Sequence, residues 1–502
     1  MSLWIATFLR SLPLDAVHPR WSPESAFAVL EQARVAALTP AAAAMGIHTG
    51  MRRAGAAAIA PDVPLLTRDP LAEQHLLHET ALALLQYTPD LAIAAPDTLL
   101  LQVSASLMYF GGPRRLHQRI ATTLQGMSLH TSLGMAPTAQ GAWLLAHQSS
   151  IRTPRRTLQI HTLARRLDTL SHTLLSSAEP RREWLHSIGC RTLGDLRRLP
   201  RAGLQRRCGT ELLHTLDAAY GDAPECHVWI QPPARFFQRL ELPDYVEHAE
   251  AVLSWAQRLI EPLCGWLVAR RRAVQHLTLA LEHERGRHAR PPTTLPISLA
   301  QPAWQASHLR NLLREKLGRL PLEAPAIALS LRVDDTVEQP AASTCLFPEP
   351  GGSPAEHARL LDLLSARLGR ERVLQAQPVA DHRPETANRW CAAQDAKKSP
   401  DSVQHASSHT DPLSRPPFAF MDRPFWLLDP PIPLQVQQHR PVYSGQPLRL
   451  VRGPERIESG WWDAALTVRD YFVAEDAASA RYWIYRERDT EHARWFLHGR
   501  YA

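Results

Sequence analysis

The chain has 502 residues, too many for one compact domain, and 45% of them are hydrophobic, enough to form stable cores. These values exclude an intrinsically disordered chain and favour about three or four folded domains. The net charge is +7. Nearly all of the basic side chains are arginine, because the only lysines are Lys316, Lys397 and Lys398. Arginine suits bidentate phosphate contacts and hence nucleic acid, but a GC-rich genome would also give this composition.

Cysteine spacing and hydropathy exclude two further classes. No two of the six cysteines form a Cys-x-x-Cys pair, which argues against a zinc site or a disulfide framework. We therefore expect no metal and no cofactor. No charge-free apolar run is long enough to cross a membrane, and the apolar start of the chain lacks the basic region of a signal peptide. These features predict a soluble, cytoplasmic protein.

Residues 1–175 alternate short apolar runs with helical patterns, which predicts a mixed α and β domain. Within the strand expected over 98–109 and the turn after it, we expect Val103, Leu107, Tyr109 and Phe110 to be packing residues. The predicted elements are a strand over 3–8, a helix over 22–44, a helix over 71–86, a strand over 98–109, a helix over 114–124, a strand over 129–136 and a helix over 138–147.

Residues 176–230 change to short helices separated by turns that contain glycine, which is typical of helix–hairpin–helix units. In such units the backbone N–H groups of the hairpin bind a DNA phosphate without reading sequence. An ordinary solvated pair of helices is the alternative, but here the hairpin pattern coincides with a run of arginines. The residues predicted to contact DNA are Gly189, Arg191, Thr192, Gly194, Arg197, Arg198, Arg201, Gly203, Arg206 and Arg207.

Residues 236–340 predict a separate α+β domain. Its elements are a helix over 249–267, a strand over 275–283, a helix over 304–317 and a strand over 326–333. On a basic background, this arrangement suits a sheet that lies against a duplex backbone.

The remaining residues divide into three parts. Residues 341–390 hold an exposed-looking Leu346–Phe347 pair and a helix over 356–368. Residues 391–420 are rich in Ser, Asp, Pro and Lys and predict a flexible linker. Residues 421–502 are rich in aromatic residues in short alternating runs, which predicts a small β-rich module.

Two strands near the start of the chain resemble the metal-binding strands of Y-family (translesion) DNA polymerases. Ala6 stands where the first strand of that family carries an Asp, and Ser106 and Leu107 stand where the second, which begins with Ser104, carries an Asp-Glu pair. Nucleotidyl transfer in this family needs two Mg²⁺ ions held by carboxylates. The resemblance therefore implies a palm with no catalytic residues.

The phosphate-binding motifs of the same family are also altered. The stretch 40–46 lacks the Tyr and the Arg that the fingers of this family carry just before a Phe-Gly turn. After 132–137, Thr138 and Ala139 replace an Asn-Lys pair. The alternative is a working polymerase whose acids come from other positions, such as Asp15. A second alternative is a protein adaptor that never touches DNA.

Six C-terminal stretches, far more specific than the palm motifs, resemble the ImuB-type proteins, catalytically inactive Y-family paralogues of the bacterial SOS mutasome. The resemblance covers the whole length. It implies an α+β multidomain chain with degenerate palm and fingers, a helix–hairpin–helix thumb, an α+β little finger and the β-rich module. It also implies a scaffold that binds damaged primer-template DNA, the sliding clamp, an ImuA-type RecA-like protein and an error-prone C-family DNA polymerase. The stretches are 368–377, 381–385, 423–428, 453–463, 469–472 and 495–499.

The resemblance also suggests where proteins would bind. Leu346 and Phe347 match the anchor of the family's clamp-binding peptide, although its leading Gln is missing, and the pair would otherwise pack against the little finger. Trp461, Trp462, Arg469 and Tyr471 are candidate partner anchors, while most aromatic residues of the module would form its core. Which C-terminal segment meets which partner is not evident from the sequence.

Overall fold

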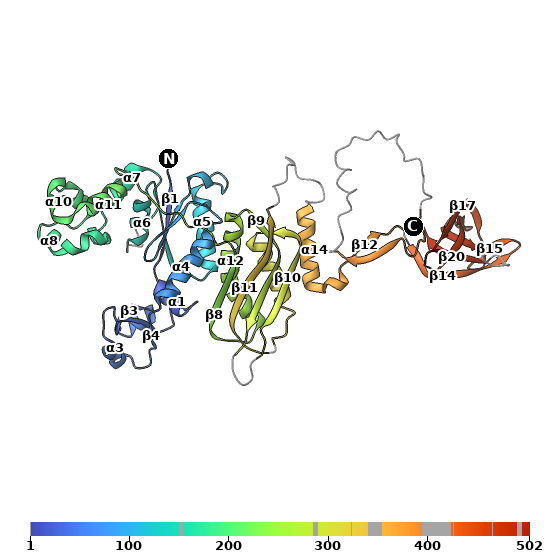
Figure 1. The fold of residues 1–502 in the computed structure, drawn as a ribbon, viewed down its shortest axis with the longest axis horizontal. Coiled ribbons are helices and arrows are strands. Elements are labelled where there is room, and N and C mark those ends of the chain that lie inside the picture. The colour runs from blue at the N-terminus through green and yellow to red at the C-terminus, as the bar shows by residue number, and fades with distance from the viewer. Residues whose placement is uncertain are drawn as a thin grey trace. The chain divides into compact units, whose positions relative to one another are not determined.

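The computed structural model describes residues 2–149, 154–284, 290–322, 324–339, 354–393, 423–424, 426–463, 465–488 and 494–501 (Figure 1). The chain divides into two compact units, Met1–Arg367 and Leu368–Ala502, and each has its own hydrophobic clusters. In the described residues, no helix is long and apolar enough to cross a membrane.

A four-stranded antiparallel sheet of order β5-β6-β1-β7 forms the palm, in the first unit. Helices α4 and α5 pack on one face, through the cluster that contains Ile5 and Leu101. Helix α6 packs on the other face, through the cluster that contains Ala6 and Leu145. The elements are β1 (Trp4–Leu9), α4 (Pro70–Leu84), β5 (Leu91–Ala94), β6 (Thr98–Gln102), α5 (Pro113–Gly126), β7 (Thr131–Ala136) and α6 (Ala139–His147).

Three predicted helices of this domain, over 71–86, 114–124 and 138–147, are confirmed as α4, α5 and α6. The helix predicted over 22–44 is wrong. The chain there forms a hairpin whose turn lies at Gln32 and Ala33, both at positive φ, followed by a single short helix. The hairpin and β4 form a second sheet of order β3-β2-β4. The elements are α1 (Leu12–Val17), β2 (Ala28–Glu31), β3 (Arg34–Leu38), α2 (Pro40–Ala44), α3 (Arg53–Ile59) and β4 (Leu65–Thr67).

The thumb is a group of short helices beside α6 (Figure 1). One hydrophobic cluster runs from the palm into this group, from Ala142 and Leu145 on α6 to Leu196 and Leu216. The thumb therefore shares a core with the palm instead of having a core of its own. Its helices are α7 (Ile160–Leu167), α8 (Arg182–Ser187), α9 (Leu193–Arg198), α10 (Arg201–Cys208) and α11 (Thr210–Tyr220).

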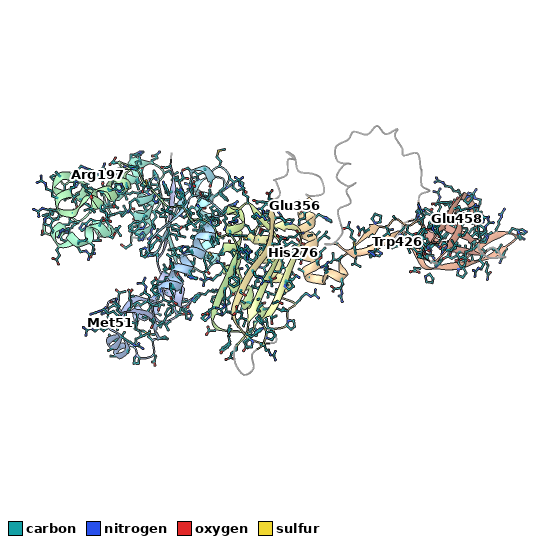
Figure 2. All side chains as sticks on the ribbon, in the orientation of Figure 1. Met51, Arg197, His276, Glu356, Trp426 and Glu458 are labelled. Carbon is teal, nitrogen blue, oxygen red and sulfur yellow. The ribbon has the colours of Figure 1, made fainter. Side chains whose placement is uncertain are left out.

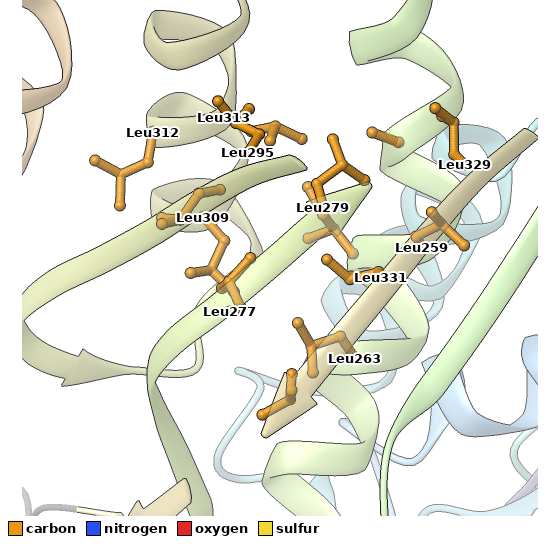
Figure 3. Close-up of a cluster of buried hydrophobic side chains, with 14 of the residues drawn as sticks. Leu259, Leu263, Leu277, Leu279, Leu295, Leu309, Leu312, Leu313, Leu329 and Leu331 are labelled. Carbon is orange, nitrogen blue, oxygen red and sulfur yellow. The ribbon is translucent and has the colours of Figure 1, made fainter. Parts of the chain in front are cut away.

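The little finger is an antiparallel sheet of order β10-β9-β11-β8 with α12 and α13 packed against it. Figure 3 shows how Leu277 and Leu279 of the sheet meet Leu259 of α12 and Leu309 of α13. The two helices and two strands predicted for this domain are confirmed. The elements are β8 (Phe237–Val246), α12 (Ala249–Ala269), β9 (Arg272–Glu282), β10 (Thr293–Ala303), α13 (Ala306–Leu317), β11 (Ala326–Glu338) and, after it, α14 (Pro354–Leu368).

Helix α12 of the little finger crosses α4 of the palm at Gly265. A Cβ atom at this position would clash with the carbonyl oxygen of Leu82, so only glycine allows the two backbones to approach this closely. Arg258 of α12 is buried near Glu79 of α4. Burial raises the pKa of Glu79 to about 7, and the positive charge of Arg258 opposes this rise.

The second unit contains a hairpin and a seven-stranded antiparallel sheet of order β16-β15-β14-β20-β19-β18-β17, which confirms the predicted β-rich module. Arg383, which follows β12, pairs with Asp463, which follows β17, at 2.6 Å. The hairpin therefore belongs with the sheet, and the unit begins at Leu368. The strands are β12 (Leu374–Pro378), β13 (Asn388–Ala392), β14 (Trp426–Gln437), β15 (Arg440–Tyr443), β16 (Gln446–Pro447), β17 (Arg449–Ser459), β18 (Thr467–Glu475), β19 (Arg481–Glu487) and β20 (Trp495–Arg500).

Candidate nucleic-acid interface and palm site

Ala6 lies at the centre of β1 and is fully buried. Its neighbours across the sheet are Leu100 on β6 and Gly134 on β7. Its side chain belongs to the apolar cluster beneath α6. Ala6 stands where the family carries a metal-binding Asp. Its side chain here only packs in the core and has no polar atom.

Serines and a leucine follow β6 at the second palm position. The strand predicted over 98–109 ends at Gln102, and Ser104–Ser106 form a turn of 3₁₀ helix. The Ser104 hydroxyl accepts hydrogen bonds from the backbone N–H of Leu3 at 2.8 Å and from the Gln102 side chain at 3.0 Å. Ser106 is half-buried and offers only a neutral hydroxyl group.

The four packing residues predicted at this strand and its turn are only partly confirmed. Val103 and Phe110 are buried, and Leu107 packs against the cluster beneath α4 and α5. Tyr109 is 86% exposed, so its predicted burial is wrong. The alternation of a strand does not continue past Gln102, because the chain turns there.

The N-terminus of α6 holds a carboxylate of the chain itself. Thr138 caps this helix, and its hydroxyl accepts a hydrogen bond from the backbone N–H of Gly141 at 3.1 Å. The Glu225 carboxylate accepts two more, from the backbone N–H groups of Ala139 at 2.8 Å and Gln140 at 2.6 Å. A helix N-terminus attracts an anion, and here Glu225 supplies it. Nothing in the local sequence indicates this contact.

Asp15, the alternative source of an acid, lies on α1 and is buried. Its carboxylate accepts hydrogen bonds from Trp21 Nε1 at 2.8 Å and, through the ring N–H, from His130 Nδ1 at 3.0 Å. Burial raises its pKa, although the bonds to His130 and Trp21 oppose the rise. In the described part of the chain, no group of three or more His, Cys, Asp or Glu side chains could hold a metal ion.

The first thumb hairpin, between α8 and α9, uses its own N–H groups. Asp195 accepts hydrogen bonds from the backbone N–H groups of Arg191 at 3.2 Å and Thr192 at 3.0 Å, which completes a capping box with Thr192. Gly194 is buried, and a Cβ atom there would lie 2.9 Å from the carbonyl oxygen of Asp168. Gly189 is exposed at positive φ, but its N–H bonds to the carbonyl of His186. This hairpin would therefore meet a phosphate through arginine side chains.

The six arginines predicted to contact DNA fall into two groups. Three have acidic neighbours: Arg201 bonds to Asp217, Arg198 lies near Asp195, and Arg197, labelled in Figure 2, stacks on Tyr220 at 4.3 Å. Arg197 is also 3.8 Å from Asp222. In the described part of the chain, the other three arginines have no ion pair with a carboxylate. They are Arg191, Arg206 and Arg207.

The second hairpin, between α10 and α11, leaves a helix N-terminus open. Gly209 is exposed at positive φ, and no side chain caps the start of α11. Arg206 and Arg207 are exposed in the preceding turn of α10, and the Arg207 guanidinium lies 5.1 Å from the Trp184 ring. In the described residues, an uncapped helix N-terminus lies beside two guanidinium groups without a carboxylate partner, which makes this hairpin the strongest candidate phosphate site on the thumb. Gly203 lies on α10 in open space. Gly209 was not among the predicted residues, although glycine directly after Arg-Arg-Cys was a usable signal.

The four candidate partner anchors of the second unit separate into surface and core residues. Trp461 and Trp462 are 74% and 54% exposed, and their rings meet edge to face at 4.8 Å. Tyr471 is fully buried, and Arg469 donates a hydrogen bond to its hydroxyl at 3.2 Å. Only the tryptophan pair is open to a partner. The clamp candidates Leu346 and Phe347 lie outside the described residues.

We predict that Glu225→Ala exposes the N–H groups at the start of α6. The loss of two charge-assisted hydrogen bonds should lower the free energy of unfolding by about 1 kcal/mol. Added phosphate should then raise the melting temperature of the variant more than that of the unaltered protein. Thermal denaturation with and without phosphate measures this, with the exposed Glu247→Ala as the control. An equal response to phosphate in all three proteins would contradict the prediction.

Comparisons with known proteins place this geometry in a family context. Residues 16–147 match the impB/mucB/samB family. The chain is 26% identical over 484 residues to Protein ImuB of Caulobacter vibrioides, in two strains, and the match covers 91% of this chain and 99% of that protein. Among solved structures, it matches the insertion ternary complex of Dbh DNA polymerase with a TM-score of 0.38, 16% identity and 67% of this chain against 100% of that one. A Y-family DNA polymerase chimera of Dbh and Dpo4 gives a TM-score of 0.37, 15% identity and 68% against 100%. The chain is therefore similar to ImuB over 91% of its length, and residues 16–147 resemble the impB/mucB/samB family.

Proposed function

We propose that this chain is a non-catalytic scaffold for error-prone translesion DNA synthesis in bacterial SOS mutagenesis. The observation that carries the proposal is the fully buried, apolar environment of Ala6 at the centre of the palm sheet. Two-metal nucleotidyl transfer needs carboxylates whose negative charge balances the charge of the metal ions. Ser106 and Leu107 are neutral and cannot supply this negative charge. The similarity to ImuB over 91% of the chain supports a DNA-damage role.

In this proposal the chain binds damaged primer-template DNA through the phosphate backbone. The uncapped N-terminus of α11 supports the thumb as the main contact, and so do three arginines that form no ion pair in the described residues, Arg191, Arg206 and Arg207. Contacts of this kind position a protein on DNA without reading its sequence.

The proposal also includes three protein partners in the cytoplasm: the sliding clamp, an ImuA-type RecA-like protein and an error-prone C-family DNA polymerase that performs the synthesis. The exposed pair Trp461 and Trp462 supports a protein-binding surface on the second unit, because tryptophan is enriched at binding hot spots. The clamp contact would use Leu346 and Phe347.

The purified chain should not extend a primer on a template in the presence of Mg²⁺ or Mn²⁺, because neutral residues replace the metal-binding carboxylates. Incorporation of labelled nucleotides measures this, with a known polymerase as the positive control. Template-dependent incorporation that is lost in Asp15→Asn would overturn the non-catalytic assignment.

Replacing Arg206 and Arg207 by glutamine should weaken binding to primer-template DNA equally for all sequences. It should also reduce the slope of log affinity against log salt by about 2, because two phosphate contacts are lost. Fluorescence anisotropy at several salt concentrations measures both effects. The matched control replaces Arg197 and Arg201, which have acidic neighbours. Equal losses in the two variants would exclude a specific role for the second hairpin.

Leu346→Ala with Phe347→Ala should abolish recovery of the sliding clamp in a pull-down, because both apolar anchors of the peptide are removed. The control is Leu450→Ala with Val451→Ala, two exposed apolar residues on β17. Unchanged clamp recovery would place the clamp contact elsewhere in the chain.

A further inference from the structure

A cavity of about 440 Å³ lies between the start of α5, the end of β7, the segment after residue 153 and α7. Three arginines line it: Arg114, Arg156 and Arg166. The rest of its lining is neutral, without any Asp, Glu or aromatic side chain. None of its residues belongs to the thumb hairpins or to the palm positions Ala6, Ser106 and Leu107.

The backbone holds two of these arginines in place. Residues 155–157 run along the edge of the palm sheet, where Met135 N–H donates to the carbonyl of Arg155 at 2.8 Å and Thr157 N–H donates to the carbonyl of Met135 at 2.9 Å. Arg166 on α7 donates hydrogen bonds to the carbonyls of Pro154, at 3.1 Å, and of Arg156. The wall of the cavity is therefore hydrogen-bonded to the sheet edge.

Within the described residues, no carboxylate balances the positive charge of Arg114 and Arg156 in the cavity, because neither forms an ion pair with one. Burial, together with the positive charge of Arg156, lowers the pKa of His117 on α5 to about 4, so this neighbour is neutral at physiological pH. The 14-residue α5 also begins beside the cavity without a side-chain cap, which adds the positive end of its dipole.

We propose that this cavity binds a phosphate group and that the group belongs to the backbone of a bound nucleic acid. A guanidinium group can donate two parallel hydrogen bonds to the oxygens of one phosphate group. The positive charge of the cavity arginines also favours an anion. A free nucleotide fits less well, because no aromatic side chain of the lining could stack on its base. The choice of nucleic acid as the source rests on the proposed function, whereas the phosphate chemistry does not.

The test uses one double variant of the full-length chain, in which both Arg114 and Arg156 are replaced by glutamine (the cavity variant). The matched control is a second double variant, in which the exposed Arg319 and Arg367 are replaced by glutamine, so that it also loses two positive charges. The cavity variant should weaken primer-template binding about tenfold near 0.1 M salt and reduce the salt slope by about 2, while the control stays close to the unaltered protein. It should also lose the binding of inorganic pyrophosphate measured by calorimetry.

The two ligands separate the possible outcomes. If the cavity variant matches the control for both DNA and pyrophosphate, the proposal is overturned. If only pyrophosphate binding is lost, the cavity binds small phosphate compounds, and the nucleic-acid source is wrong. If the unaltered chain binds no DNA at all, the proposed function fails. The pyrophosphate measurement alone then shows whether the cavity binds phosphate. If the cavity variant melts early, the exposed single variant Arg114→Gln is measured in the same way.

Discussion

The first unit depends on a close contact between α6 and the palm sheet at Gly134. A Cβ atom there would clash with the carbonyl oxygen of Ala142 and lie 2.6 Å from the backbone nitrogen of Ala146. Ala6, opposite Gly134 in the register, is also a small residue. Close packing of this kind tolerates little added volume. Helix α6 also packs against the thumb through the shared hydrophobic cluster. The small residues Ala6 and Gly134 therefore allow the close approach of α6 on which the packing of both the palm and the thumb depends.

The regular helices of the fold could be predicted from the sequence, whereas the first hairpin could not. α5 and α12 carry apolar residues at helical spacing over 14 and 21 residues, and this pattern favours a helix. The alanines between residues 26 and 37 also suit a helix, but pairing of β2 with both β3 and β4 overrides this weak preference. Strand pairing is a non-local interaction, and a pattern read along the chain does not contain it.

The candidate site shows the same division. The replacements at Ala6, Ser106 and Leu107 could be predicted, because each depends on one position within a local motif. The spacing of Thr192 and Asp195 is a capping-box signal and could have shown that the first hairpin uses its own N–H groups. Glu225 could not be predicted, since it contacts α6 from more than 80 positions away in the sequence.

The segment that carries Glu225 also limits how far the thumb can move. Glu225 is bound to α6, and further on the N–H of Ile230 donates to the carbonyl of Leu91 on β5. Trp229 stacks on Trp4 of β1 at 6.0 Å. Only four residues lie between Tyr220, the last residue of α11, and Glu225, and the five steps from one to the other span at most about 17 Å. The short link keeps the thumb close to the palm. Under the proposed function, a duplex bound by the thumb would therefore reach the palm without a second diffusional search.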